Sequence, residues 1–87
     1  MNEAEIFNNI RNILFDMGNP GYLINKETNL EKDLGFDYLD LADFMVRIER
    51  KFEIQIDINL IPNIKCLKFE SIGSTIDFLL KEYNINK

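Results

Sequence analysis

The chain has 87 residues, of which 46% are hydrophobic and 29% charged, so it has room for one folded domain, 1–87, and is too apolar for a disordered chain. The 15 Asp and Glu residues outnumber the 10 Lys and Arg residues and give a net charge of −5, which excludes nucleic acid as an expected partner because backbone binding needs a clustered basic face. With no His and one Cys, the chain lacks the commonest zinc ligand and general base, so neither a metal site nor an enzyme is expected.

Neither a membrane segment nor a leader is visible in the sequence. No stretch approaches the roughly 18 apolar residues that a membrane span needs. Residues 1–9 lack a basic region followed by an apolar run. We therefore expect a cytoplasmic domain without a membrane partner.

Helical spacing of apolar residues predicts a first helix from Ala4 to Met17. Glu3 and Glu5 lie near the positive end of the helix dipole, and Gly18 is a helix stop. The apolar positions are Ile6, Phe7, Ile10, Ile13, Leu14 and Met17.

A long loop is expected between residues 18 and 36. Gly18, Pro20 and Gly21 favour turns early in this stretch, and Gly35 does so near its end. Apolar residues within the loop should pin it to the core. They are Tyr22, Leu23, Ile24, Leu30 and Leu34.

The second helix should begin at Asp37, whose carboxylate can accept from backbone N–H groups of the first turn. Asp40 adds negative charge where the helix dipole favours it. The apolar set is wider than one stripe, so the helix is expected to contact neighbours on more than one side. This set comprises Leu39, Leu41, Ala42, Met45, Val46, Ile48 and Phe52.

The pattern from Ile54 to Phe69 fits two structures. Residues 54–60 alternate like a strand, residues 60–67 fit a short helix, and Pro62 argues against either running through unbroken. Ser71 can cap a last helix, whose apolar residues are Ile72, Ile76, Phe78, Leu79, Leu80 and Tyr83. The expected fold class is all-α, a small three- to four-helix bundle with a long loop between the first two helices.

The segment DLGFDYLDLADFMVRIERKFEIQI, Asp33 to Ile56, resembles the core motif of acyl carrier proteins and peptidyl carrier domains. That family has Asp-Leu-Gly, one variable residue and Asp-Ser-Leu at the head of its second helix, then a Glu, a Phe and an Ile. The segment Ser71 to Tyr83 is similar to the family's last helix, so the resemblance covers nearly the whole chain and implies the acyl-carrier-protein fold. The stretch between Ile56 and Ser71 is a few residues longer than expected. The residues in register are Asp33, Leu34, Gly35, Asp37, Leu39, Asp40, Glu49, Phe52 and Ile56.

Tyr38 stands where the family has the serine that accepts a phosphopantetheine arm, whose thiol carries an acyl or aminoacyl group. A phenol oxygen lies farther from the backbone on a rigid ring, and misplacement by about 1 Å can cost about a hundredfold in rate. The only serines, Ser71 and Ser74, are distant in sequence. We therefore expect no cofactor on the chain as written, and 4′-phosphopantetheine if residue 38 were serine. Either the chain is a natural degenerate carrier or a serine has been altered in an ordinary one.

The resemblance implies that carboxylates near Tyr38 form a docking surface for basic patches on partner enzymes. The alternative is that Asp37 and Asp40 cap the helix while Asp33 and Asp43 are solvated, and both interpretations can hold together. The expected partner-binding residues are Asp33, Asp37, Leu39, Asp40, Asp43 and Glu49.

Basic residues follow these carboxylates on the same predicted helix. Arg47, Arg50 and Lys51 interrupt the acidic face that carriers usually present. Asp43 and Arg47 form an i,i+4 pair, which cancels the negative field locally. Recognition by standard partners is therefore expected to be weaker or different.

Three further features have competing interpretations. Tyr38 is either an exposed anchor for a partner or a tolerated surface residue. Cys66 is expected to be a small buried or half-buried hydrophobe, and the alternative, which we favour less, is a reactive thiolate beside Lys65 and Lys68. A set of apolar residues either lines an acyl pocket or, as we favour, fills the core: Phe7, Leu39, Phe44, Met45, Val46, Phe52, Ile76, Phe78 and Leu79.

Two functions follow from the sequence. The first is a monomeric carrier-like domain that docks on acyl, aminoacyl or peptidyl synthesis enzymes. The alternative is a degenerate carrier that acts as a protein-interaction or regulatory module without cargo. A stand-alone enzyme is not expected, because no nucleophile is paired with a base.

Overall fold

A computed structural model describes residues 2–19, 24–56 and 71–82 of the chain. These ranges contain the helices α1 (Glu3–Asp16), α2 (Tyr38–Phe52) and α3 (Ile72–Glu82), and no strand among them is longer than the isolated bridge between Asn29 and Ser71. The expected all-α class is therefore confirmed. The first helix lies one residue earlier than expected at each end, and Asp37 caps α2 as the sequence predicted.

Several sequence expectations fall on residues outside the described ranges. The strand-or-helix question over residues 57–70 is one of them, and the fate of Cys66 is another. The same is true of Tyr22, Leu23 and Tyr83, which were expected to pack against the core. For Ile54 and Ile56 the structure describes irregular backbone directly after α2.

The three helices begin with the same pair of reciprocal hydrogen bonds. The side chain of the cap residue accepts from the backbone N–H of the residue three positions later. The side chain of that later residue accepts from the backbone N–H of the cap residue. This reciprocal bonding satisfies N–H groups that a helix start otherwise leaves without partners. The residue pairs are Asn2 with Glu5, Asp37 with Asp40, and Ser71 with Ser74.

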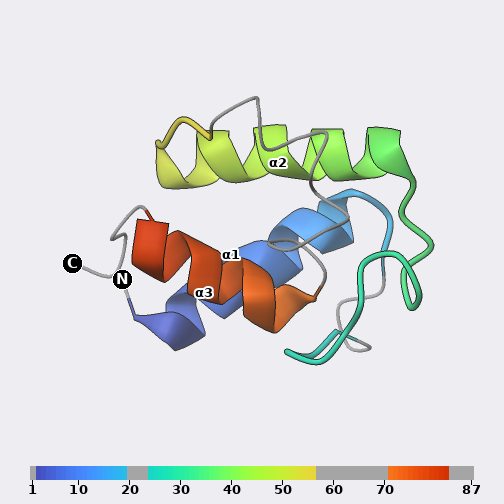
Figure 1. Ribbon diagram of the computed structural model, residues 1–87, viewed down its shortest axis with the longest axis horizontal. Coiled ribbons are helices and arrows are strands. Elements are labelled where there is room, and N and C mark those ends of the chain that lie inside the picture. The colour runs from blue at the N-terminus through green and yellow to red at the C-terminus, as the bar shows by residue number, and fades with distance from the viewer. Residues whose placement is uncertain (1, 20–23, 57–70, 83–87) are drawn as a thin grey trace.

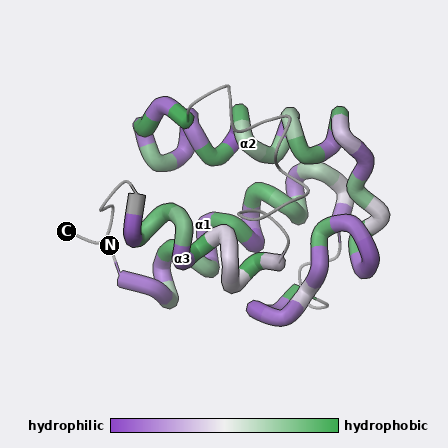
Figure 2. The backbone as a smooth tube through the Cα atoms, in the orientation of Figure 1, coloured by the Kyte–Doolittle hydropathy of each residue, from purple (hydrophilic) through white to green (hydrophobic). Residues whose placement is uncertain are grey.

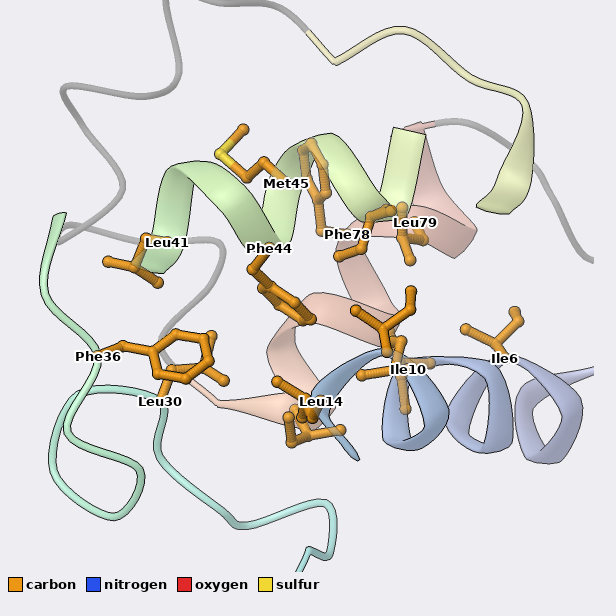
Figure 3. Close-up of a cluster of buried hydrophobic side chains, with 14 of the residues drawn as sticks. Ile6, Ile10, Leu14, Leu30, Phe36, Leu41, Phe44, Met45, Phe78 and Leu79 are labelled. Atoms are coloured by element: carbon orange, nitrogen blue, oxygen red, sulfur yellow. The ribbon is translucent and has the colours of Figure 1, made fainter. Parts of the chain in front are cut away.

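Helix α1 packs against both α2 and α3, and α2 lies along one side of the other two (Figure 1). Each helix carries both hydrophobic and hydrophilic residues (Figure 2), as amphipathic helices do. The buried apolar side chains of all three helices meet in one cluster, together with residues of the loop before α2 and with Ile56 after it (Figure 3). Its members are Ile6, Ile10, Ile13, Leu14, Ile24, Leu30, Phe36, Leu41, Phe44, Met45, Ile48, Ile56, Ile72, Ile76, Phe78 and Leu79.

The core expectation was wrong for Leu39 and Val46, whose side chains are 74% and 41% exposed. Both belong to the outer side of α2, while the buried residues Leu41, Phe44 and Ile48 belong to its inner side. The reason is that the core formed by the described residues lies on one side of α2, so an apolar residue on the opposite side is left exposed.

The loop before α2 is fastened to the other two helices. The backbone N–H of Gly73 donates to the carbonyl of Lys26 at 2.8 Å, and that of Ile72 donates to the carbonyl of Thr28 at 3.1 Å. The exposed side chain of Lys26 pairs with Glu3 of α1, and this hydrogen bond and charge raise the pKa of the Lys26 amine above its ordinary value. These contacts fix the position of the loop relative to α1 and α3, and the loop leads from there to the first residue of α2.

Candidate functional site: the exposed head of α2

The Asp33-Leu34-Gly35 motif forms a tight turn that ends just before α2. Asp33 Oδ2 accepts from the backbone N–H of Asn29 at 2.7 Å, while Asn29 Oδ1 accepts from that of Lys32 at 2.8 Å. Gly35 ends the turn with φ +71°, a left-handed conformation that L side chains rarely adopt. The next backbone N–H, that of Phe36, donates to the carbonyl of Leu30 at 3.0 Å and closes the turn.

Phe36 anchors the chain immediately before the helix cap. Its side chain is buried, and its ring meets the ring of Phe44 edge-on, with the centroids 6.0 Å apart and the planes at 76°. Phe36 and the buried Leu41 also occupy the two positions of a hydrophobic staple, which fixes the angle at which a chain enters a helix. The sequence analysis did not single out Phe36, although an aromatic residue directly before an Asp cap is the signal that could have identified it.

The reciprocal cap then holds residue 38 at the surface. Asp37 Oδ1 accepts from the backbone N–H of Asp40 at 2.9 Å, and Asp40 Oδ2 accepts from that of Asp37 at 3.0 Å. Tyr38 is the first residue of α2 and is 49% exposed, and Leu39 beside it is more exposed still. Buried Phe36 and the Asp37–Asp40 cap thus fix the start of α2 so that the side chains of Tyr38 and Leu39 point outward.

The carboxylates expected to bind partners also have partners within the chain. Besides the acceptors at Asp33, Asp37 and Asp40, Asp43 Oδ1 receives the Nε–H of Arg47 at 3.0 Å. Glu49 Oε2 receives the backbone N–H of Ile56 at 2.6 Å. The capping alternative raised from the sequence therefore holds for Asp37 and Asp40, whereas Asp33 and Asp43 are exposed but bonded.

These carboxylates are not all in one place. Asp33, Asp37 and Asp40 lie in the turn and cap that begin α2, and Asp43 follows in the next turn of the helix. Glu49 is half-buried and, at 1.5 Å per helical residue, lies about 14 Å along the axis from Asp40. The structure thus separates Glu49 from the acidic head of the helix.

The aliphatic hydroxyls of the chain are bonded within the fold. The serines Ser71 and Ser74 bond each other at the start of α3, where Ser74 Oγ also donates to the carbonyl of Ser71 at 2.9 Å. The threonines are buried, with Thr75 Oγ1 donating to the carbonyl of Ser71 and Thr28 Oγ1 accepting from the backbone N–H of Asn25. These residues are all the Ser and Thr of the sequence, so the chain's aliphatic hydroxyls do not fit a site for attaching an exposed arm.

No described helix is long and apolar enough to cross a bilayer. No three acidic, Cys or His side chains of the described ranges are grouped as metal ligands would be.

Comparison with known proteins agrees with this geometry. The sequence model of the phosphopantetheine attachment site family matches residues 19–79. An acyl carrier protein of Guillardia theta is 30% identical over 80 residues, covering 91% of this chain and 93% of its own, and one of Chlorobium phaeovibrioides is 30% identical over 83 residues, covering 94% and 100%. The mitochondrial acyl carrier protein of Saccharomyces cerevisiae is 32% identical over 75 residues, which are 83% of this chain but only 56% of the yeast protein.

The family match and the exposed helix head define the class of protein, a helical carrier domain. The chain belongs to the acyl carrier protein family.

Proposed function

We propose that residues 1–87 form one carrier-like domain that docks through the head of α2 on acyl, aminoacyl or peptidyl synthesis enzymes with basic docking patches. Asp33, Asp37, Asp40 and Asp43 would face those patches, and exposed Leu39 would enter an apolar site on the partner. The domain would act as a monomer in the cytoplasm, without catalysis of its own. Family membership and the exposure of the α2 head together support this role.

We also propose that Tyr38 occupies the place of the arm-bearing serine, so that the chain is not phosphopantetheinylated. The observation that carries this proposal is the position of Tyr38, exposed as the first residue of α2 directly after the Asp37 cap. The bonded states of Ser71 and Ser74 support it, because moving either hydroxyl to a transferase would break the start of α3. A serine hydroxyl at position 38 would be exposed, and its use by a transferase would leave the start of α3 intact.

Mass spectrometry after incubation with coenzyme A and a broad-specificity phosphopantetheinyl transferase tests both proposals. We expect no adduct on the chain as it is and one adduct on the Tyr38→Ser variant. Tyr38→Ala is the control for loss of the phenol, and Leu39→Ser is the control for position, because its hydroxyl lies about 100° farther around the helix. A folded Tyr38→Ser variant that stays unmodified would contradict the carrier proposal.

The alternative proposal, a protein-interaction or regulatory module without cargo, has its own support. Among the described residues the exposed large hydrophobic side chains are Phe15 of α1 and three residues of α2, namely Tyr38, Leu39 and Val46. A carrier that has lost its cargo but keeps a partner would retain such a surface. Affinity capture separates the two proposals: synthases and transferases support docking on biosynthetic enzymes, and unrelated proteins lost on Tyr38→Ala support the module.

A further inference from the structure

We propose that Arg47 is a specificity-determining residue of α2, because it acts as an internal counterion for Asp43. It fits the domain to a partner that is basic opposite the head of α2 but uncharged and apolar opposite Asp43. The inference rests on the proposed function, since it concerns the same docking helix. It adds the chemistry of the partner surface beyond the helix head, which family membership does not supply.

Asp43 lies in the middle of the exposed apolar face of α2. Leu39 is four residues before it and Val46 is three residues after it, and this spacing puts the three side chains on one face of the helix. All three are exposed. A partner that covers both Leu39 and Val46 must therefore also cover the carboxylate of Asp43.

A carboxylate covered by an apolar partner needs a counterion. Taking a charge out of water costs free energy unless a cation or hydrogen-bond donors replace the lost hydration. A free carboxylate at Asp43 would therefore favour a partner that brings Lys or Arg to this point. The neighbouring charges of α2 decide whether a partner has to supply that cation.

Arg47 supplies the cation from within the chain. Its Nε–H donates to Asp43 Oδ1 at 3.0 Å across one turn of α2. The side chains of Arg47 and Asp43 remain 39% and 51% exposed, so a partner can contact both. A basic group of the partner would have to displace Arg47 from Asp43 and would be repelled by it. An uncharged apolar surface meets neither obstacle, so Asp43 contributes to a basic partner only when Arg47 releases it.

The charges that follow do not make this part of α2 acidic again. The acidic excess of the helix is at its head, where Asp37 and Asp40 form the cap. Between residues 41 and 53 the acidic and basic side chains are equal in number, so a basic patch fits the first turn and a neutral surface fits the turns after it. The acidic ones are Asp43, Glu49 and Glu53, and the basic ones are Arg47, Arg50 and Lys51.

Two other roles of Arg47 predict different results. If Arg47 only supported the helix, its removal would lower the melting temperature slightly and leave docking unchanged, because an exposed pair of this spacing adds little stability. If it repelled basic enzymes as an independent charge, its removal would improve docking with or without Asp43. A counterion of Asp43 predicts an improvement that requires the Asp43 carboxylate.

The probe is a broad-specificity phosphopantetheinyl transferase with a basic carrier-docking surface, acting on Tyr38→Ser chains with coenzyme A at physiological ionic strength. Adding Arg47→Ala should lower KM about twofold with kcat unchanged, because Asp43 becomes available to the enzyme. In chains that also contain Asp43→Asn, Arg47→Ala should bring no such gain. Arg47→Lys keeps a cation within reach of Asp43 and should keep the KM of Tyr38→Ser alone.

Lys51→Ala is the matched control, because Lys51 is an exposed cation of the same helix and lies about 12 Å from Asp43 along the axis. Its removal changes the net charge equally but should change KM less, since screening acts over about 8 Å at this ionic strength. Circular dichroism and the melting temperature establish that each variant is folded.

Three results would overturn the inference while loading of Tyr38→Ser still upheld the proposed function. They are no response to Arg47→Ala, the same gain from Arg47→Ala with and without Asp43, and an equal gain from Lys51→Ala. Failure of every folded variant to load would remove the proposed function, and the inference with it.

Discussion

The side chain of Glu49 reaches past the end of α2 and binds the backbone of Ile56, with 2.6 Å between Oε2 and N. Its own carbonyl accepts from the N–H groups of Glu53 and Ile54. One residue thus bonds both the helix end and the segment that carries buried Ile56 back to the core. The Glu of the family motif therefore has a structural task here that does not depend on a partner.

Replacing Glu49 by Ala should lower the free energy of unfolding by about 1 to 3 kcal/mol, because the half-buried N–H of Ile56 would lose a charge-assisted bond. Glu49→Gln keeps a carbonyl acceptor and should cost less. Urea unfolding followed by circular dichroism measures both values. Glu31→Ala, which removes an exposed carboxylate from the loop, is the control and should change stability by less than about 0.5 kcal/mol. Equal losses at Glu49 and Glu31 would show that the bond is not formed in solution.

Two substitutions of Asp37 distinguish its role as a helix cap from its proposed role as a docking charge. Asp37→Ala should cost about 1 kcal/mol of stability, since the N–H of Asp40 loses its acceptor. Asp37→Asn keeps an acceptor oxygen and should leave stability nearly unchanged while removing one negative charge. If the α2 head docks on a basic patch, Asp37→Asn should still raise KM in the Tyr38→Ser loading assay. An unchanged KM for folded Asp37→Asn would show that this carboxylate serves the helix alone.

Gly35→Ala tests the turn that feeds the head of α2. A Cβ at Gly35 would meet no atom within 4 Å, so the expected loss comes from the backbone at φ +71° and not from a clash. We expect a loss of about 1 to 2 kcal/mol in thermal or urea unfolding. Gly35→Asn should cost less, because Asn tolerates the left-handed region. A loss of the same size for both variants would contradict the backbone explanation.

The helix starts could be predicted because their chemistry is local. Asp and Ser are residue types that commonly cap helices, and Asp37 and Ser71 each accept from a backbone N–H only three residues away. A short window of sequence therefore contains the whole interaction. The head of α2 was therefore anticipated, with the acidic residues around it. Asn2 was missed, although Asn at that position followed by Glu5 carries the same local signal.

Burial on α2 could not be predicted in the same way. A pattern of apolar residues identifies side chains able to enter a core, but Leu39 and Val46 are exposed because no described helix covers that side of α2. The role of Glu49 was missed for a related reason, since its bond to Ile56 spans the end of the helix. That path depends on a left-handed residue at Glu53, which hydrophobic spacing does not reveal.

Glu53 gives the last prediction, because it ends α2 with φ 55° and ψ 46°, a left-handed conformation that usually belongs to Gly. A residue with a Cβ loses roughly 1 to 2 kcal/mol of stability in this conformation. Gly avoids that loss, but it also makes the unfolded chain more flexible, which offsets part of the gain. Glu53→Gly should therefore raise the free energy of unfolding by about 0.5 to 1 kcal/mol in urea denaturation. Glu53→Ala is the control, since it removes the same charge without relieving the backbone and should bring no gain. Equal stabilisation by Gly and Ala would assign the effect to the lost carboxylate at the negative end of the helix dipole.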